Sequence, residues 1–222
     1  ILENKTDRDR LNDINVWYND QWGYHKNYVL LVDTSSLNAW VTSVTKGGNS
    51  SRLNFLSASV CLDIAEQLLK GDRPTRNEED SHRIFIITPY RAHAKLLKLM
   101  IKERQLENDI NADTVHGFQG REAEIVLFDF VADKPHWRVN MFIPKYDENN
   151  KRLLNVALTR PKNRLIIVGN FNYCMKKGKR AFIGSKLIPF LISQARYMKV
   201  DAKEVITKGL AAQAAHAAIM AQ

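Results

Sequence analysis

The sequence predicts an α/β domain with a mostly parallel sheet flanked by helices. Short apolar runs without polar alternation occur at residues 84–87, 125–130 and 165–168, which is typical of strands that are buried on both faces. Between such runs lie segments whose apolar residues recur every three or four positions, as on one face of a helix. Alternation of buried strands with amphipathic helices is the pattern of a parallel sheet covered by helices.

The first half of the chain supplies strands and helices in turn. A strand is predicted at residues 28–32, and the Ser-, Thr-, Asn- and Gly-rich stretch 33–51 is expected to be a loop interrupted by Gly47-Gly48. The next helix is expected to end at Gly71 and has apolar positions at Leu53, Leu56, Val60, Ile64 and Leu68. After the strand 84–87, a second helix is expected to bury Ala92, Leu96, Leu99 and Met100 and to expose Lys95, Lys98 and Lys102.

The second half continues the alternation. Strands are predicted near 112–115, at 125–130 and at 165–168, helices at 153–158 and near 186–197, and a polar loop at 132–150. We therefore expect a polar, aromatic N-terminal segment at 1–27, the folded domain at 28–200, and an Ala-rich tail or linker at 201–222.

The charge of the chain is concentrated in its last third. The net charge of the 222 residues is +9, and residues 151–222 carry 14 Lys and Arg against 2 Asp and Glu. Such an excess predicts a surface that faces polyphosphate, the alternative being a solvated basic face. Cys61 and Cys174 match no metal-ligand spacing and are interpreted as reduced thiols of an intracellular, cytoplasmic protein. The chain has no apolar run long enough to predict a membrane span, and the absence of an initiator Met predicts a piece of a longer protein.

Arg160 is the first candidate for chemistry. Pro161 disfavours the helical conformation for the residue before it, so the helix should stop at about Thr159 and leave Arg160 with a fixed exit direction. An arginine held in this way suits a γ-phosphate, because nucleotide hydrolases use arginine to neutralise the charge on a transferring phosphoryl group. The alternative is an arginine that caps the helix carbonyls or pairs with a surface carboxylate.

A second candidate cluster runs from Thr114 to Glu122. Gly117 and Gly120 flank Phe118-Gln119 and allow close approach of backbone to a ligand, whereas Phe118 is expected in the core. Glu122 could accept a hydrogen bond from a ribose hydroxyl or hold a water near phosphate; otherwise it is a surface carboxylate at the start of a strand. Thr114 could donate to a nucleic-acid phosphate, and His116 is interpreted as a turn residue. Because ligands of parallel sheets bind at the carboxyl ends of strands, we expect Thr88, residues 114–122 and Asn170 there.

These two clusters resemble sequence motifs of a known family. Leu154-Asn155-Val156-Ala157-Leu158-Thr159-Arg160, with Val115-His116-Gly117-Phe118-Gln119-Gly120-Arg121-Glu122, resembles motifs VI and V of superfamily 1 helicases. The resemblance is to the 5′-to-3′ translocating class that includes RNA-surveillance helicases and replication nuclease–helicases. Residues 86–91 and Ser51-Arg52-Leu53-Asn54 resemble the segments that precede motif V. The chain departs from the family pattern at His116, Pro161 and Ser57-Ala58.

The resemblance implies a RecA-like domain of the P-loop NTPase type, the second motor domain of an ATP-dependent DNA or RNA helicase or translocase. Arg160 would be the arginine finger, with Glu122 as its catalytic companion, and Gly120 and Glu122 would lie beside the ribose and γ-phosphate of ATP. Thr88 and Thr114 would contact the backbone of single-stranded DNA or RNA, and Gln119 would couple the two sites. ATP and Mg²⁺ would be held mainly by the first motor domain of the same chain, and no membrane partner is implied.

The sequence contains no G-x-x-x-x-G-K-[ST] phosphate loop, so we expect this segment alone to be inactive. Asp147-Glu148 lies in a polar loop and is a poor metal-binding pair. A non-catalytic nucleic-acid-binding module that retains the motor fold is the alternative. A Rossmann enzyme is disfavoured because no G-x-G-x-x-G follows a predicted strand. A nuclease is disfavoured because no metal-ligand spacing is formed by His93, His116, His136, Asp129 and Asp133.

Overall fold

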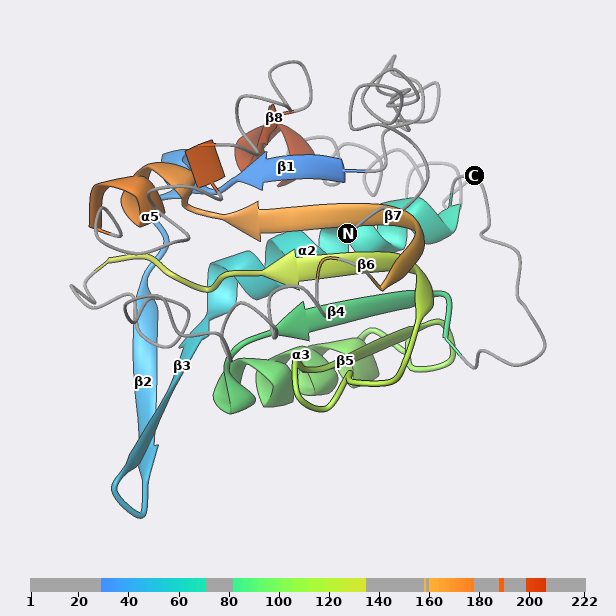
Figure 1. Ribbon diagram of the computed structural model, residues 1–222, viewed down its shortest axis with the longest axis horizontal. Helices are drawn as coiled ribbons and strands as arrows, with labels where there is room; N and C mark the ends of the chain where they lie inside the picture. Colours follow the sequence, from blue (N-terminus) through green and yellow to red (C-terminus); the bar gives the residue numbers. More distant parts are fainter. Residues whose placement is uncertain are drawn as a thin grey trace, which may run out of the picture.

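A six-stranded parallel sheet forms the centre of the protein. The computed structural model describes residues 29–70, 82–134, 158, 160–177, 188–189 and 199–206. The strand order is β5-β4-β6-β7-β1-β8, and every hydrogen-bonded neighbour in this sheet is parallel (Figure 1). The strands are β1 Val29–Asp33, β4 Ile84–Thr88, β5 Ile110–Thr114, β6 Ala123–Asp129, β7 Pro161–Gly169 and β8 Lys199–Asp201. The arrangement confirms the predicted α/β class and is that of a RecA-like domain.

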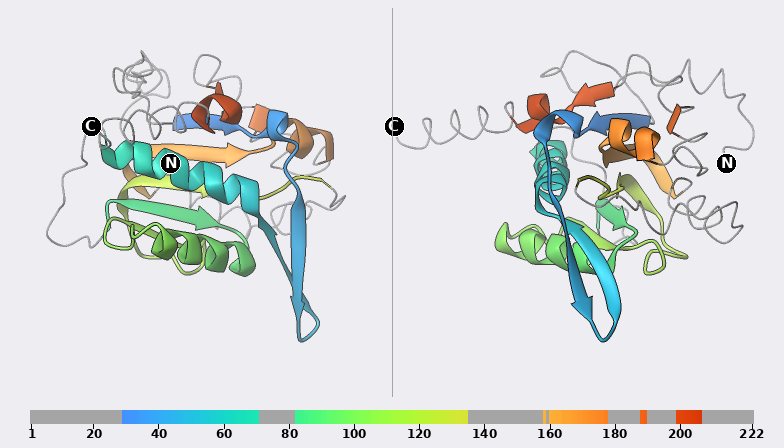
Figure 2. Two further views of the ribbon diagram at one scale, coloured as in Figure 1. Left: turned by 180° about the vertical axis from the view of Figure 1, so that it is seen from behind. Right: turned by 90° about the vertical axis from the view of Figure 1, so that its left-hand side faces the viewer.

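Helices α2 (Phe55–Lys70) and α3 (Arg91–Glu103) cover one face of the sheet (Figure 2, left). The opposite face is covered in part by the connection between β5 and β6. A short helix, α5 (Phe171–Lys177), follows β7 directly. All five residues of β4 are buried, which explains why its sequence is apolar without alternation.

The expected loop at 33–51 is wrong in most of its length. The segment contains a 3-10 turn, η1 (Ser35–Leu37), and an antiparallel hairpin of β2 (Val41–Lys46) and β3 (Asn49–Asn54). Gly47 and Gly48 both have positive φ, +57° and +78°, and form the two-residue turn. Two central residues of positive φ match the right-handed twist of a hairpin, so the glycine pair ends one strand and starts the next. This hairpin also takes Leu53 away from the predicted helix, which begins at Phe55.

The predicted buried stripe of α3 is partly wrong. The buried residues are His93, Ala94, Leu97 and Ile101, while Leu99 is 63% exposed. Leu96 and Met100 pack only partly against the core. The inward face of the helix is therefore rotated relative to the predicted stripe: it carries the apolar residues Ala94, Leu97 and Ile101 together with His93.

The sheet continues past residue 200, the predicted end of the folded domain. Strand β8 pairs with β1, and the following residues Ala202 and Val205 are fully buried against the core. Residues 201–206 therefore pack with the sheet, and the division into three segments otherwise stays a prediction.

Several expectations fall on residues outside the described ranges. These are the aromatic segment 1–27, the loop 135–150, most of the helices at 153–158 and 186–197, the Asp147-Glu148 pair, the basic residues 179–180 and the tail from 207. Within the described residues, no helix is both long and apolar enough to cross a membrane.

Candidate functional site

The predicted nucleic-acid contacts lie at the carboxyl edge of the sheet. Thr88 and Thr114 are the last residues of β4 and β5 and are paired in register. Val115 donates its backbone N–H to the carbonyl of Thr88 at 3.1 Å, and Gly117 donates to the hydroxyl of Thr114 at 3.2 Å. The Thr114 hydroxyl therefore accepts one bond and keeps its own proton for a further acceptor. The Thr88 side chain is fully buried, and the exposed residues near this corner include Arg91 and His116.

From Thr114 the chain crosses the sheet to the opposite edge. Residues 115–122 pass over β4, because β5 and β6 are parallel and are separated by that strand. The connection is anchored by Phe118, which is fully buried with its ring centroid 4.4 Å from that of Phe85. It turns tightly, with Phe118 donating to the Thr114 carbonyl and Arg121 to the Phe118 carbonyl. The prediction that Phe118 lies in the core is confirmed.

The two glycines of this connection are required for different reasons. Gly120 has a φ of +80°, which side chains rarely adopt, and the space where its Cβ would stand is open. At Gly117 a Cβ would lie 2.5 Å from the carboxyl carbon of Asp113, so a larger residue would require that side chain to move. Gln119 lies between them, and its N–H donates to the His116 carbonyl. His116 is exposed in the turn, as expected of a turn residue.

Glu122 and Arg160 meet at the amino edge of the sheet. Each immediately precedes a strand, and the first residues of those strands, Ala123 and Pro161, are register partners. The nearest charged atoms, Arg160 Nη1 and Glu122 Oε1, are 3.9 Å apart, and the side chains are 35% and 53% exposed. The expectation that residues 114–122 all lie at carboxyl ends is therefore wrong for Glu122. The connection must return to the starting edge before a parallel strand can begin.

The Arg160–Glu122 pair has the features of an open anion site. At 3.9 Å the ion pair is longer than a hydrogen bond, and exposed pairs of this kind contribute little to stability. Arg160 Nε is buried and has no hydrogen-bond partner among the described residues. A phosphate oxygen can therefore displace the carboxylate from the guanidinium without breaking a strong bond, so the residues fit a nucleotide. Within the described part of the chain, no three His, Cys, Asp or Glu residues are grouped to hold a metal ion.

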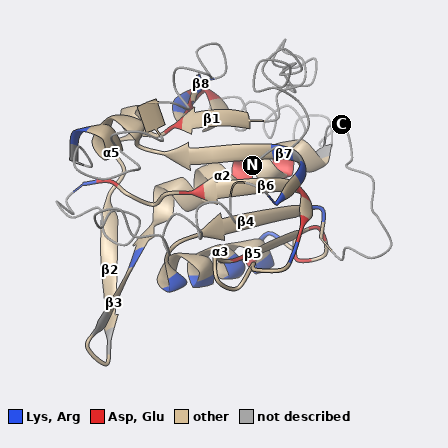
Figure 3. Ribbon diagram, viewed as in Figure 1, with Lys and Arg blue, Asp and Glu red and all other residues tan. Residues whose placement is uncertain are grey.

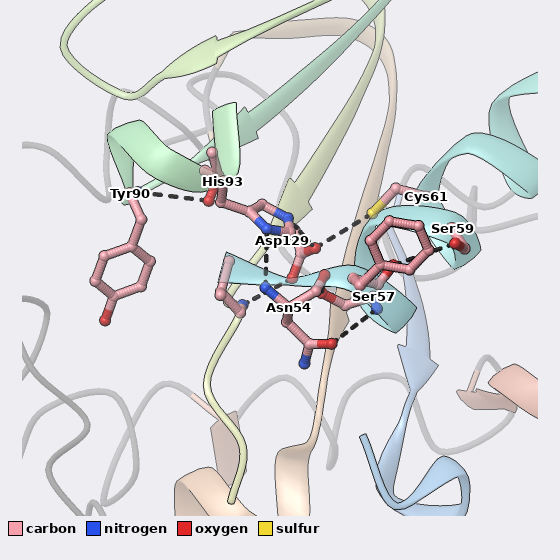
Figure 4. Close-up of polar contacts among 10 residues, drawn as sticks. Asn54, Ser57, Ser59, Cys61, Tyr90, His93 and Asp129 are labelled. Carbon is pink, nitrogen blue, oxygen red and sulfur yellow. Dashed lines mark hydrogen bonds and ion pairs between the residues drawn. The ribbon is translucent and has the colours of Figure 1, made fainter. Parts of the chain in front are cut away.

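A buried polar network lies next to the carboxyl edge and was not predicted from the sequence (Figure 4). His93 Nε2 is 2.8 Å from Asp129 Oδ2, and neither side chain is exposed. The backbone N–H of Asn54 donates to His93 Nδ1 at 3.3 Å, which makes Nδ1 the acceptor and leaves the ring proton on Nε2. His93 therefore donates to Asp129, which also accepts from Val131 N–H and from the Cys61 thiol.

This network joins the hairpin to the helix that follows Thr88. Asn54 caps α2 by accepting from Ser57 N–H at 3.1 Å, and Ser51 of β3 accepts from Ala92 N–H at 2.9 Å in the first turn of α3. Arg52 lies over the ring of Tyr90 at 5.7 Å. Burial raises the pKa of Tyr90 to about 12, against the opposing effect of Arg52. The Asn54-x-x-Ser57 spacing was the available cap signal, whereas no local pattern could pair His93 with Asp129.

Comparison with known proteins places the chain in a family. A family model described as AAA domain matches residues 2–172. The chain is 37% identical over 122 residues to an uncharacterized ATP-dependent helicase of Methanocaldococcus jannaschii. The matched residues are 55% of the chain and 15% of that protein. It is 34% identical over 97 residues to DNA polymerase alpha-associated DNA helicase A of Saccharomyces cerevisiae, covering 44% of the chain and 13% of the helicase. It is also 31% identical over 144 residues to the DNA replication ATP-dependent helicase/nuclease JHS1 of Arabidopsis thaliana, covering 64% of the chain and 9% of that protein.

The chain thus spans about a sixth or less of the length of these relatives. The family match covers more than half of the chain and agrees with the parallel sheet and with the motif residues at its two edges. The chain therefore belongs to the AAA domain family of superfamily 1 helicases.

Proposed function

We propose that this chain is the second motor domain of an ATP-dependent helicase or translocase that acts on single-stranded DNA or RNA. Arg160 is the arginine finger, and Glu122 and Gly120 lie beside the nucleotide. Thr114 belongs to the strand grip, and Thr88, whose side chain is fully buried, supports Thr114 as its register partner. The first motor domain, elsewhere in the same protein, supplies the phosphate loop and the ligands of Mg²⁺.

The observation that carries this proposal is the separation of the candidate residues onto opposite edges of one sheet. Arg160 and Glu122 lie at the amino edge, whereas Thr88 and Thr114 lie at the carboxyl edge. A single connection, residues 115–122, runs from one to the other and contains Gln119. Because buried Phe118 anchors this connection, a movement caused by nucleotide binding at the amino edge can be transmitted to the strand grip. A motor requires this coupling.

Arg160 acts in this proposal through charge and geometry. ATP bound between the two motor domains supplies the phosphoryl group that is transferred to water. The Arg160 guanidinium turns from Glu122 toward the phosphate oxygens and offers its exposed Nη atoms as donors. Pro161 restricts the backbone after Arg160 because its φ is fixed, so the point from which the guanidinium turns is set before the reaction. Glu122, released from the ion pair, accepts from a ribose hydroxyl.

ATP turnover by the full-length protein, with and without a single-stranded oligonucleotide, tests this proposal. Arg160→Ala is expected to lower the strand-stimulated rate by about 10³-fold or more, because arginine fingers contribute about that much. Arg160→Lys keeps the charge but loses the planar fork, so its rate should remain well below that of the wild type. Strand affinity and the thermal midpoint should stay close to wild type in both variants, since the ion pair with Glu122 is exposed.

Two results would contradict the motor assignment. Strand-stimulated turnover that survives in Arg160→Ala would remove Arg160 from the catalytic site. Strand binding without any turnover in the wild type would instead establish the alternative, a nucleic-acid-binding module that retains the motor fold.

A further inference from the structure

Two large aromatic side chains are exposed at the base of the β2–β3 hairpin. Trp40 is 68% exposed and Phe55 is 61% exposed. Trp40 immediately precedes Val41, and Phe55 immediately follows Asn54. Val41 and Asn54 are register partners and both are buried, so the backbone next to each ring is held in place. Exposure of a large aromatic at a rigid position costs solvation free energy without contributing to the core, which indicates a binding role.

The hairpin lies across the carboxyl edge of the sheet. In Figure 2 (right), which faces the ends of the strands, β2 and β3 descend across that edge and past α3. Ser51 and Asn54 of β3 contact Ala92 and His93 at the start of α3. This helix starts three residues after Thr88, at the carboxyl end of β4. The hairpin base therefore stands beside the corner that contains the proposed strand grip.

Exposed cations begin at this corner and continue along α3. Arg91, Lys95, Lys98 and Lys102 are all exposed on α3 at the spacing of one helix face (Figure 3). Among them only Lys98 has a carboxylate partner in the described part of the chain, Asp113 at 3.2 Å. On the other side of the hairpin base, the carbonyl of exposed Lys134 accepts from Val41 N–H at 2.8 Å, which places this residue next to Trp40.

Aromatic rings among free cations match the surface chemistry of single-strand binding. Bases stack on aromatic side chains whatever their sequence, while cations follow the phosphates. The core of a protein interface is apolar, whereas the exposed positions described along the hairpin combine the single apolar Val44 with polar Thr42, Thr45 and Ser50. The observations therefore favour nucleic acid over a docked protein.

We propose that Trp40 and Phe55 form a base-stacking platform that holds single-stranded nucleic acid as it leaves or enters the grip at Thr88 and Thr114. This inference rests on the proposed function, because it assumes that the strand runs along the carboxyl edge. The platform binds bases without reading their sequence, and Arg91, Lys95 and Lys134 neutralise the neighbouring phosphates.

Binding of a fluorescent 20-nucleotide dT or U oligomer to the full-length protein, measured over a range of salt concentrations, tests the platform. Trp40→Ala and Phe55→Ala are each expected to weaken binding by about 5- to 100-fold, the usual loss for one stacked base. Trp40→Phe keeps a ring and should bind within about 3-fold of wild type. Leu99→Ala, which removes an equally exposed apolar side chain from α3, is the matched control and should not change the affinity.

The salt dependence separates stacking from charge. Trp40→Ala should leave the slope of log K against log salt unchanged, whereas Lys95→Ala should reduce the slope by about one phosphate contact. In addition, an oligomer substituted with 5-iodouracil should crosslink to Trp40 or Phe55 on irradiation, as located by mass spectrometry.

The outcomes distinguish this inference from the function on which it rests. If the wild type binds the oligomer and Trp40→Ala and Phe55→Ala bind as tightly as Leu99→Ala, the platform is wrong and the motor proposal stands. If the aromatic variants lose ATP turnover measured without a strand but keep strand affinity, the rings face another protein domain and the platform is again wrong. If the wild type neither binds a strand nor hydrolyses ATP, the proposed function fails and the platform fails with it.

Discussion

His93 Nε2 and Asp129 Oδ2 lie 2.8 Å apart in an environment from which both side chains are fully shielded. The pair joins α3, which follows the proposed grip at Thr88, to the carboxyl end of β6. A carboxylate removed from water must be hydrogen-bonded, and His93 supplies one of the donors that make its burial tolerable. The inward face of α3 carries His93 together with Ala94, Leu97 and Ile101, and it leaves Leu99 outside.

Removal of His93 should destabilise the protein strongly. His93→Ala leaves Asp129 with fewer donors in a dry site, so we expect a loss of about 3 kcal/mol or more in the free energy of unfolding, measured with urea. Lys95→Ala, on the exposed face of the same helix, is the control and should change stability by less than about 0.5 kcal/mol. Equal stability of the two variants would show that Asp129 finds other partners.

The double variant His93→Leu/Asp129→Leu provides a second check. Because both polar groups are then absent, the cost should be smaller than that of His93→Ala alone, if the penalty comes from an unpaired carboxylate. A larger cost in the double variant would assign the effect to packing instead.

The cap that Ser51 provides to α3 should be measurable. Ser51→Ala leaves the N–H of Ala92 without its side-chain acceptor, so we expect a loss of about 1 kcal/mol in the free energy of unfolding. Ser50→Ala, at the neighbouring exposed position of β3, is the matched control and should be close to neutral. If both variants unfold at the same denaturant concentration, water replaces the cap that Ser51 provides.

Gly120 should be sensitive to substitution through its backbone. Gly120→Ala forces a side chain into a φ of +80° where no atom obstructs the Cβ, so the cost is conformational and should be about 1–2 kcal/mol. Gly120→Asn should cost less, because Asn tolerates left-handed φ better than Ala. Unfolding curves of the three proteins check this order, and a Gly120→Ala variant as stable as the wild type would contradict it.

Both cysteines should be unreactive in the folded protein. Cys61 and Cys174 are free and fully buried, and burial raises the pKa of Cys174 to about 12 and that of Cys61 well above its ordinary value. Since the thiolate is the reactive form, labelling with a thiol reagent between pH 7 and 9 should be slow and should accelerate only on unfolding. Lys95→Cys supplies an exposed thiol as a positive control.

The same pKa shift fixes the sign of a pH effect on stability. Burial raises the pKa of the Cys174 thiol in the folded state. The buried neutral thiol therefore contributes fully to the free energy of unfolding below the ordinary thiol pKa of 9.0, and this contribution is lost as pH rises toward about 12. The Cys174→Ala variant should therefore lose less stability than the wild type when the pH is raised from 9 to 10.5, as measured by urea unfolding. A greater loss in the variant would contradict this sign.

The parallel sheet could be predicted from the sequence, because strands buried on both faces are continuously apolar and the runs within β4, β6 and β7 are so. The sequence also predicted that Phe118 is a core residue and that Arg160 and Glu122 each lie next to a strand. These features are local, since each depends on the residue types within a few positions.

The contacts between residues far apart in the sequence follow only from the folded structure. Arg160 faces Glu122 at the amino edge because their strands are register partners, although 38 positions separate them in the sequence. His93 lies on the inward face of α3 and pairs with Asp129, which follows it by 36 positions in the sequence. Trp40 and Phe55 flank one hairpin pair because Gly47 and Gly48 reverse the chain between them. Burial, charge pairing and strand register are properties of the folded chain as a whole, so no short pattern could specify them.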